Sequence, residues 1–355
     1  MSDIKTLVKQ ASHYFTGNTL SLLAGFISFP ILTRVFTVSD YGIMNLISIT
    51  LVFVTALCKL GINKGAARFY EEFNSGKRKS NPNTFQATFF WGGVFLSGGI
   101  TLIYLLSIKS ASFFVKNNYI INLFYLTVLL VWFRSISAIL LSLLNAAERS
   151  KLYSLIIIVH RYITLTLSIF LTFYFIKGLQ GYYIGIIIAE LIVVSFLVVL
   201  YLNKINPRYF SLSFLKESLQ YGLPLIAFEL AGVFLTKGDT YQLQYFKGSA
   251  EVGLYSAGYN LCTYCSQLII MPLILAIYPV YMKIWITRGK DETTKFLNRL
   301  LSYFLMLAIP IIFGIWAIGK EAITVLASSK YSSAHIILPI ILTGMFLDGC
   351  SNILG

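Results

Sequence analysis

The sequence predicts an all-α protein that crosses a membrane many times and is built from two related halves. Of its 355 residues, 57% are hydrophobic and only 12% are charged. Soluble domains carry roughly 25% charged residues, so this composition indicates an integral membrane protein. Long charge-poor segments recur along the whole chain, and one helix–turn–helix pattern occurs twice. Together these observations predict two parallel repeats, each a six-helix lobe, around a central cavity.

Ten segments are long and apolar enough to cross a bilayer, which takes roughly 20 residues of helix. In chain order the predicted spans are Tyr14–Phe36, Tyr41–Ile62, Thr84–Ile108, Tyr119–Leu144, Leu152–Ile176, Gly181–Leu202, Leu219–Thr236, Val252–Met282, Leu300–Ile318 and Ser332 onward. The connections are short, and none is long enough for an extramembrane catalytic domain. We therefore expect a protein that is not an enzyme and that needs no cofactor.

The distribution of basic residues predicts the orientation of the spans. Lysines and arginines are concentrated in the connections that share a side with the N-terminus, above all in 63–83, which contains the run Lys77-Arg78-Lys79. Basic loops stay on the cytoplasmic side, so we expect a cytoplasmic N-terminus. The same rule accounts for the net charge of +14, and no nucleic-acid partner is expected.

The repeated pattern is the turn between two helices. Phe36–Ile43 aligns with Phe246–Leu254 when one residue is inserted. Six predicted spans separate the two turns, so both enter the membrane in the same direction and the repeat is parallel. We expect an N-terminal lobe of six helices over 1–210 and the first four helices of a second lobe over 211–355, the chain being incomplete at its C-terminal end.

The four cysteines all lie in apolar segments. Cys262 and Cys265 form a CxxC pair, but no second pair has the spacing of a metal site, and both fall inside a predicted span. We interpret them as packing residues and predict no metal.

Several motifs give the chain a resemblance to a known family. Arg34-x5-Asp40-Tyr41-Gly42 closes the first helix pair, and Tyr221-Gly222-Leu223-Pro224 opens the second repeat, followed by Asp239 and by Val252–Ala257. This pattern resembles the polysaccharide transporters, the O-antigen and capsule repeat-unit flippases. They belong to the superfamily of multidrug, oligosaccharidyl-lipid and polysaccharide exporters. Its members usually have twelve to fourteen helices, which agrees with a chain that is incomplete.

The resemblance implies a function and a location. It implies a flippase that moves undecaprenyl-pyrophosphate-linked oligosaccharide across the bacterial cytoplasmic membrane, with two lobes rocking about a central cavity. It also implies polysaccharide biosynthesis proteins as partners. The turn at Asp40 needs no role in substrate binding to explain its residues. Ser39 or Asp40 can cap the second helix, so Asp40 is not among the predicted substrate contacts.

Four charged residues stand out inside predicted spans, where charge is costly and usually faces a polar interior. Arg134, Arg161, Glu190 and Glu229 all lie roughly 14 to 18 Å from the inner ends of their helices, which suggests one polar layer near the midplane.

Two interpretations of this layer stay open. In a structural one, Arg161 pairs with Glu190 and Arg134 with Glu229, and the pairs only fix helix packing. In a functional one, the two arginines bind the pyrophosphate through their planar forks, with Lys59 as a weaker candidate. Glu190 and Glu229 then couple transport to H⁺ or Na⁺. His160 is expected to pack or to face lipid, because it points about 100° away from Arg161 on a helix.

The sequence leaves other function classes to be weighed. A drug or cation antiporter of the same superfamily would need Glu190 and Glu229 free of basic neighbours. A membrane glycosyltransferase or O-antigen polymerase would need a sizeable outer loop with catalytic groups, and none is visible. A scaffold subunit would not need buried charges at a common depth.

Overall fold

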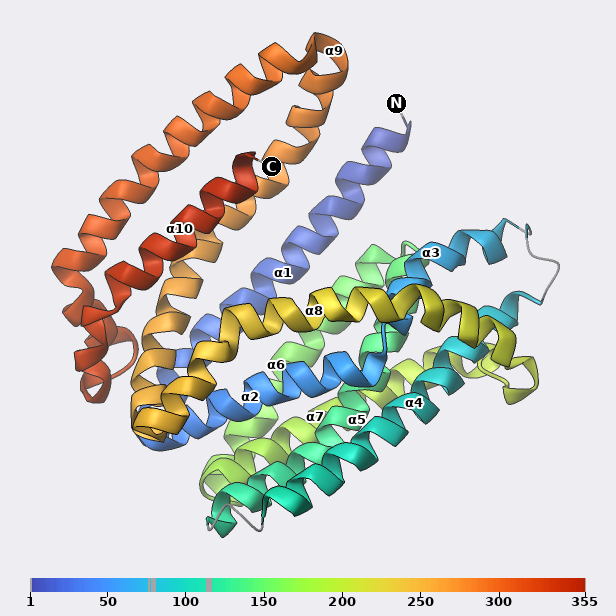
Figure 1. Cartoon of the computed structure of the whole chain (residues 1–355), viewed down its shortest axis with the longest axis horizontal. Coiled ribbons are helices and arrows are strands. Elements are labelled where there is room, and N and C mark those ends of the chain that lie inside the picture. The colour runs from blue at the N-terminus through green and yellow to red at the C-terminus, as the bar shows by residue number, and fades with distance from the viewer. Residues whose placement is uncertain (1, 76, 78–80, 113–116, 355) are drawn as a thin grey trace. The chain divides into compact units, whose positions relative to one another are not determined.

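The computed structural model describes residues 2–75, 77, 81–112 and 117–354, and its described residues are almost entirely helical (Figure 1). The helices are α1 (Ser2–Val35), α2 (Val38–Lys59), α3 (Ile62–Asn74), α4 (Pro82–Ala111), α5 (Asn118–Ala146), α6 (Ser150–Tyr174), α7 (Leu179–Tyr201), α8 (Leu212–Lys247), α9 (Ser249–Leu326) and α10 (Leu338–Leu354). Three short 3₁₀ helices are η1 (Leu202–Lys204), η2 (Pro207–Tyr209) and η3 (Ser329–Ile336).

Eight helices of the described chain are long and apolar enough to cross a membrane, or nine if η3 and α10, which meet at a 60° bend, form one span. The prediction of an all-α membrane protein is therefore confirmed. The eighth and ninth predicted spans both fall in α9, which turns back on itself in Figure 1. The turn lies at Gly289, whose φ of 78° and ψ of −171° interrupt the helix.

One predicted connection is wrong, because the first half of 63–83 forms the helix α3. Its buried side chains are Ile62, Ala66, Phe69 and Phe73, a spacing that places them on one face of a helix. Its polar residues occupy the opposite face. Of the basic run that follows, Arg78 and Lys79 lie outside the described residues.

The chain divides into two compact units, which we call the first unit (residues 1–25 and 46–242) and the second unit (26–45 and 243–355). In the first unit α4, α5, α6 and α7 pack in a bundle with α3 (Figure 1). Its core includes aromatic rings from three helices: Phe73 and Phe214 have centroids 4.8 Å apart, and Phe85 and Phe89 4.7 Å. The expected lobe boundary between residues 210 and 211 stays a prediction.

In the second unit the turn between α1 and α2 packs on the start of α9. Gly42 lies against the backbone carbonyl of Ser249, and Gly253 lies against the carbonyl of Val38, so neither position has room for a Cβ atom. Asn260 also donates a hydrogen bond to the Tyr41 hydroxyl at 2.8 Å. These are residues of the two repeated turns.

Arg34 and Asp40, at the first turn, also have structural roles in the second unit. Arg34 donates to the carbonyl of Val325 at 2.6 Å and thereby satisfies the C-terminal end of α9. Asp40 lies in the first turn of α2, where its backbone N–H donates to Thr37 Oγ1 at 3.1 Å. The motif that carries the resemblance therefore fixes the helices of this unit to one another.

Candidate functional site

The most deeply buried charge in the described part of the first unit is Glu190 on α7, whose side chain has no exposed surface. One carboxylate oxygen, Oε1, accepts a hydrogen bond from Ser137 Oγ at 2.6 Å. The other, Oε2, lies 3.2 Å from His160 Nε2 and 3.7 Å from Arg134 Nε. We call these four residues the Glu190 cluster.

Helix geometry explains how three elements supply this cluster. Arg134 and Ser137 are three residues apart on α5, so they share a face, and α5 and α6 both pack against α7. His160 comes from α6 and Glu190 from α7. A buried carboxylate is tolerated here because it has a hydroxyl donor on one oxygen and two basic groups beside the other.

Two pairings expected from the sequence are wrong. Glu190 faces Arg134 and His160, not Arg161, and Glu229 faces lysines, not Arg134. His160 was expected to pack or to face lipid, yet it is the closer basic neighbour of Glu190. The sequence supplied the angle of about 100° between neighbouring residues, but not which of the two faces α7.

Arg161 has no ion pair or hydrogen bond within the described residues, and it is exposed. Arg134 is one-third exposed, and its contact with Glu190 is too long for a strong hydrogen bond. The two arginines come from α5 and α6, and the acidic groups of the described chain compensate their positive charge at most in part.

A second charged group forms where α2 ends, and we call it the Glu229 cluster. Glu229 on α8 accepts a hydrogen bond from Lys59 Nζ at 2.7 Å, while Lys64 Nζ lies 4.0 Å from its other oxygen. The Lys59 side chain is 14% exposed and that of Glu229 29%. Lys59, expected to reach a cavity or the interface, is therefore already paired.

Close backbone packing positions the Glu229 cluster. The chain turns between α2 and α3 at Leu60 and Gly61, which both have positive φ. Gly61 lies directly on the backbone of Gly222 in α8, where neither glycine has room for a Cβ atom. Two turns further along α3, Arg68 lies over the ring of Tyr221, 4.9 Å from its centroid. This contact brings the end of α2 close to α8, so that Lys59 reaches Glu229.

Sequence reasoning missed three members of these clusters: Ser137, His160 and Lys64. Ser137 lies one turn from Arg134, a spacing that could have marked it. His160 and Lys64 stand beside or near residues already singled out. The common depth of the four charges stays a prediction. Within the described residues no group of three or more His, Cys, Asp or Glu side chains could hold a metal ion.

The fold is that of the MATE transporters. A multidrug resistance MATE family transporter of the MOP superfamily, in its inward-facing conformation, matches with a TM-score of 0.65 and 14% identity over 94% of this chain and 81% of that one. MATE in complex with MaL6 matches with a TM-score of 0.60 and 13% identity, covering 99% and 84%. MATE in complex with Br-NRF matches with 0.59 and 10%, covering 99% and 94%.

The family follows from the sequence match. The model of the family described as "Polysaccharide biosynthesis protein" matches residues 7–285, and the chain belongs to that family. This confirms the resemblance to the polysaccharide transporters, and with the apolar helices it makes the chain a multi-pass membrane protein. No curated protein matches the sequence.

Proposed function

We propose that the protein is a flippase that moves polyprenyl-pyrophosphate-linked oligosaccharide repeat units across the bacterial cytoplasmic membrane. The product would serve the synthesis of O-antigen, capsule or exopolysaccharide. The family match supports a role in polysaccharide biosynthesis, and the fold supports a role in transport. The observation that carries the proposal is the pair of incompletely neutralised arginines, Arg134 on α5 and Arg161 on α6. The proposal assigns no covalent chemistry to the protein.

The arginines suit a pyrophosphate because a guanidinium group presents two parallel N–H donors to two oxygens of one phosphate. Arg161 has no acidic partner in the described chain, and Arg134 lies 3.7 Å from Glu190, so both have donors to spare. Lys59 is the third proposed substrate contact. Its ammonium group would have to leave Glu229 and bind a phosphate oxygen instead, so this contact would form only during transport.

Glu190 and Glu229 are the proposed coupling sites for H⁺ or Na⁺. Glu190 lies 3.2 Å from an imidazole nitrogen, and His160 can share or exchange a proton with it. Na⁺ is a hard cation that prefers oxygen ligands, and a histidine and an arginine are poor neighbours for it. This contact favours H⁺ at Glu190.

The alternative is a drug or cation antiporter, because one structural neighbour is a multidrug resistance transporter. An organic cation needs a carboxylate that is not already neutralised. In this chain Glu190 has Arg134 and His160 beside it, and Glu229 has Lys59 and Lys64. This arrangement favours an anionic substrate, so the flippase is the preferred proposal.

The proposal also covers the topology of the chain and the path of the lipid-linked substrate. The N-terminus is cytoplasmic, the lobes 1–210 and 211–355 rock to alternate access, and the polyprenyl tail stays among membrane lipids. Glycosyltransferases and a polymerase of polysaccharide biosynthesis supply and consume the substrate. The pyrophosphate of the lipid-linked oligosaccharide contacts the two arginines.

The test is complementation of a bacterial strain that lacks its own flippase and depends on this protein for surface polysaccharide. Arg134→Ala and Arg161→Ala are expected to remove most surface polysaccharide and to accumulate lipid-linked repeat units, at normal membrane levels of the protein. Arg134→Lys and Arg161→Lys should restore part of it. Arg299→Ala, at an exposed arginine of α9, is the control and should have no effect. Normal polysaccharide in both alanine variants would contradict the assignment.

A further inference from the structure

A small polar cavity of about 60 Å³ lies in the first unit, away from both charged clusters. Its polar lining comes from Tyr70 on α3, Gln86 on α4, Arg149 after α5, and Tyr201 and Lys204 at the end of α7. The volume is several times the roughly 10–15 Å³ that a single bound water needs. Two of the residues that line it are cationic and none is acidic.

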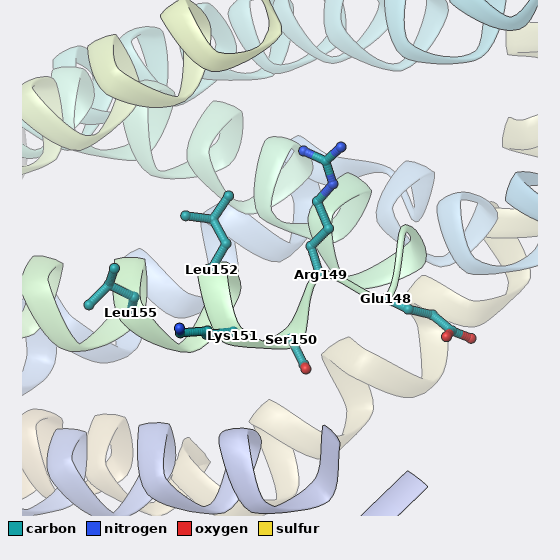
Figure 2. Close-up of a pocket in the computed structure, with 6 residues that line it drawn as sticks. All are labelled: Glu148, Arg149, Ser150, Lys151, Leu152 and Leu155. Atoms are coloured by element: carbon teal, nitrogen blue, oxygen red, sulfur yellow. The ribbon is translucent and has the colours of Figure 1, made fainter. Parts of the chain in front are cut away.

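The C-terminal ends of two helices explain why Arg149 and Lys204 lie at this cavity. They do not explain why no acidic group among the described residues compensates the two positive charges. α5 ends at Ala146 and α7 at Tyr201, and the C-terminal ends of helices attract positive charge. Neither the Arg149 nor the Lys204 side chain makes a hydrogen bond or ion pair within the described chain. In Figure 2, Glu148 extends away from the Arg149 side chain, although the two residues are adjacent.

An unpartnered polar atom also borders the cavity. The side-chain oxygen of Gln86 is buried without a hydrogen-bond partner. Buried polar atoms are nearly always satisfied by protein, water or ligand, and the two atoms of an amide are assigned from their surroundings. A bound group with polar atoms would satisfy Gln86, and the hydroxyls of Tyr70 and Tyr201 add two further donors.

We propose that this cavity binds a phosphate group, with Arg149 and Lys204 as its cationic ligands. Phosphate oxygens accept hydrogen bonds from guanidinium, ammonium and phenol groups, and the negative charge compensates the two cations. The site lies where spanning helices end, which is the depth of lipid headgroups.

Two sources share this chemistry, a phospholipid headgroup and free phosphate. Arg149 also borders a groove of about 380 Å³, which is lined further by Leu152 and Leu155 and by the polar residues Glu148, Ser150 and Lys151. Figure 2 shows the side chains of Arg149 and Leu152 on the same side of the chain. An acyl chain over these leucines would place its phosphate beside Arg149, which favours the lipid.

The experiment measures binding to the purified full-length protein in a neutral detergent. The probes are short-chain phosphatidylglycerol, inorganic phosphate and a diacylglycerol of the same chain length. Wild type should bind phosphatidylglycerol saturably and the diacylglycerol at least tenfold more weakly. Arg149→Gln combined with Lys204→Gln should weaken phosphatidylglycerol binding at least tenfold, whereas Arg149→Lys should keep most of it. Should the double variant unfold, Lys204→Gln alone, at an exposed side chain, carries the test.

The control is Lys216→Gln, an exposed lysine on α8 that lines neither cavity. Unchanged binding by this variant is expected. Inorganic phosphate that binds with the same dependence on Arg149 and Lys204 would identify free phosphate as the source. Equal binding of phosphatidylglycerol by wild type and the double variant, or an equal loss in Lys216→Gln, would overturn the proposal. None of these outcomes depends on transport.

Discussion

Gly42 and Gly253 occupy reciprocal positions: each lies against a backbone carbonyl of the turn that contains the other. Gly42 contacts Ser249, and Gly253 contacts Val38. The two glycines are also equivalent in the repeat that the sequence shows. The duplicated turns of the chain are thus alike and packed on one another, and both belong to the second unit.

We predict that Gly253→Ala lowers the free energy of unfolding of the purified protein by about 1–3 kcal/mol, the usual cost of overpacking, and therefore lowers its melting temperature. The added Cβ would overlap the Val38 carbonyl, and backbone cannot yield as a flexible side chain does. Gly314→Ala is the matched control, because it lies in the same helix with open space around it. It should be neutral or stabilising by up to about 1 kcal/mol. Equal melting temperatures for the two variants would argue against the close packing.

The sequence predicted the spans well because apolar runs of bilayer length are a strong signal. It missed α3 because this helix buries only one face, and its Lys64, Arg68 and Glu71 resemble a loop. It singled out Arg134, Glu190 and Glu229 because charge within a span is rare, and the structure places all three in charged clusters. It could not give their partners, because helix rotation is set by packing: a shift of about 100° decides whether His160 or Arg161 faces α7.

The Glu190 cluster yields a prediction on coupling. Glu190→Gln should remove the dependence of transport on a proton gradient, because the amide cannot exchange a proton with His160. The amide oxygen can still accept from Ser137, but Arg134 and His160 lose the carboxylate beside them, so the melting temperature should also fall. Glu292→Gln is the control, an exposed carboxylate 2.8 Å from Lys295.

The measurement is transport into proteoliposomes with and without an imposed pH gradient. A Glu190→Gln variant that responds to the gradient as wild type does would remove Glu190 as the coupling site. If Glu292→Gln also loses the response of transport to the pH gradient, the effect comes from the change in net charge and not from Glu190 itself.

The Lys59–Glu229 pair yields a prediction on stability. Removing one partner of a largely buried pair leaves a charge without compensation, whereas removing both leaves none. Lys59→Met and Glu229→Gln should each lower the melting temperature, and the double variant should recover at least half of the summed loss. Lys64→Gln should cost less than about 1 kcal/mol, because Lys64 is 48% exposed and 4.0 Å from Glu229. Additive losses in the double variant would show that the two residues do not interact.

The most direct test of the proposed function is a flipping assay in proteoliposomes. A fluorescent polyprenyl-pyrophosphate oligosaccharide would be placed in one leaflet, and its loss to a membrane-impermeant quencher on the other side followed with time. We predict flipping well above that of protein-free liposomes, its loss in Arg134→Ala and Arg161→Ala, and no transport of a cationic dye by the same vesicles. Flipping at the protein-free rate together with gradient-driven dye transport would contradict the flippase proposal.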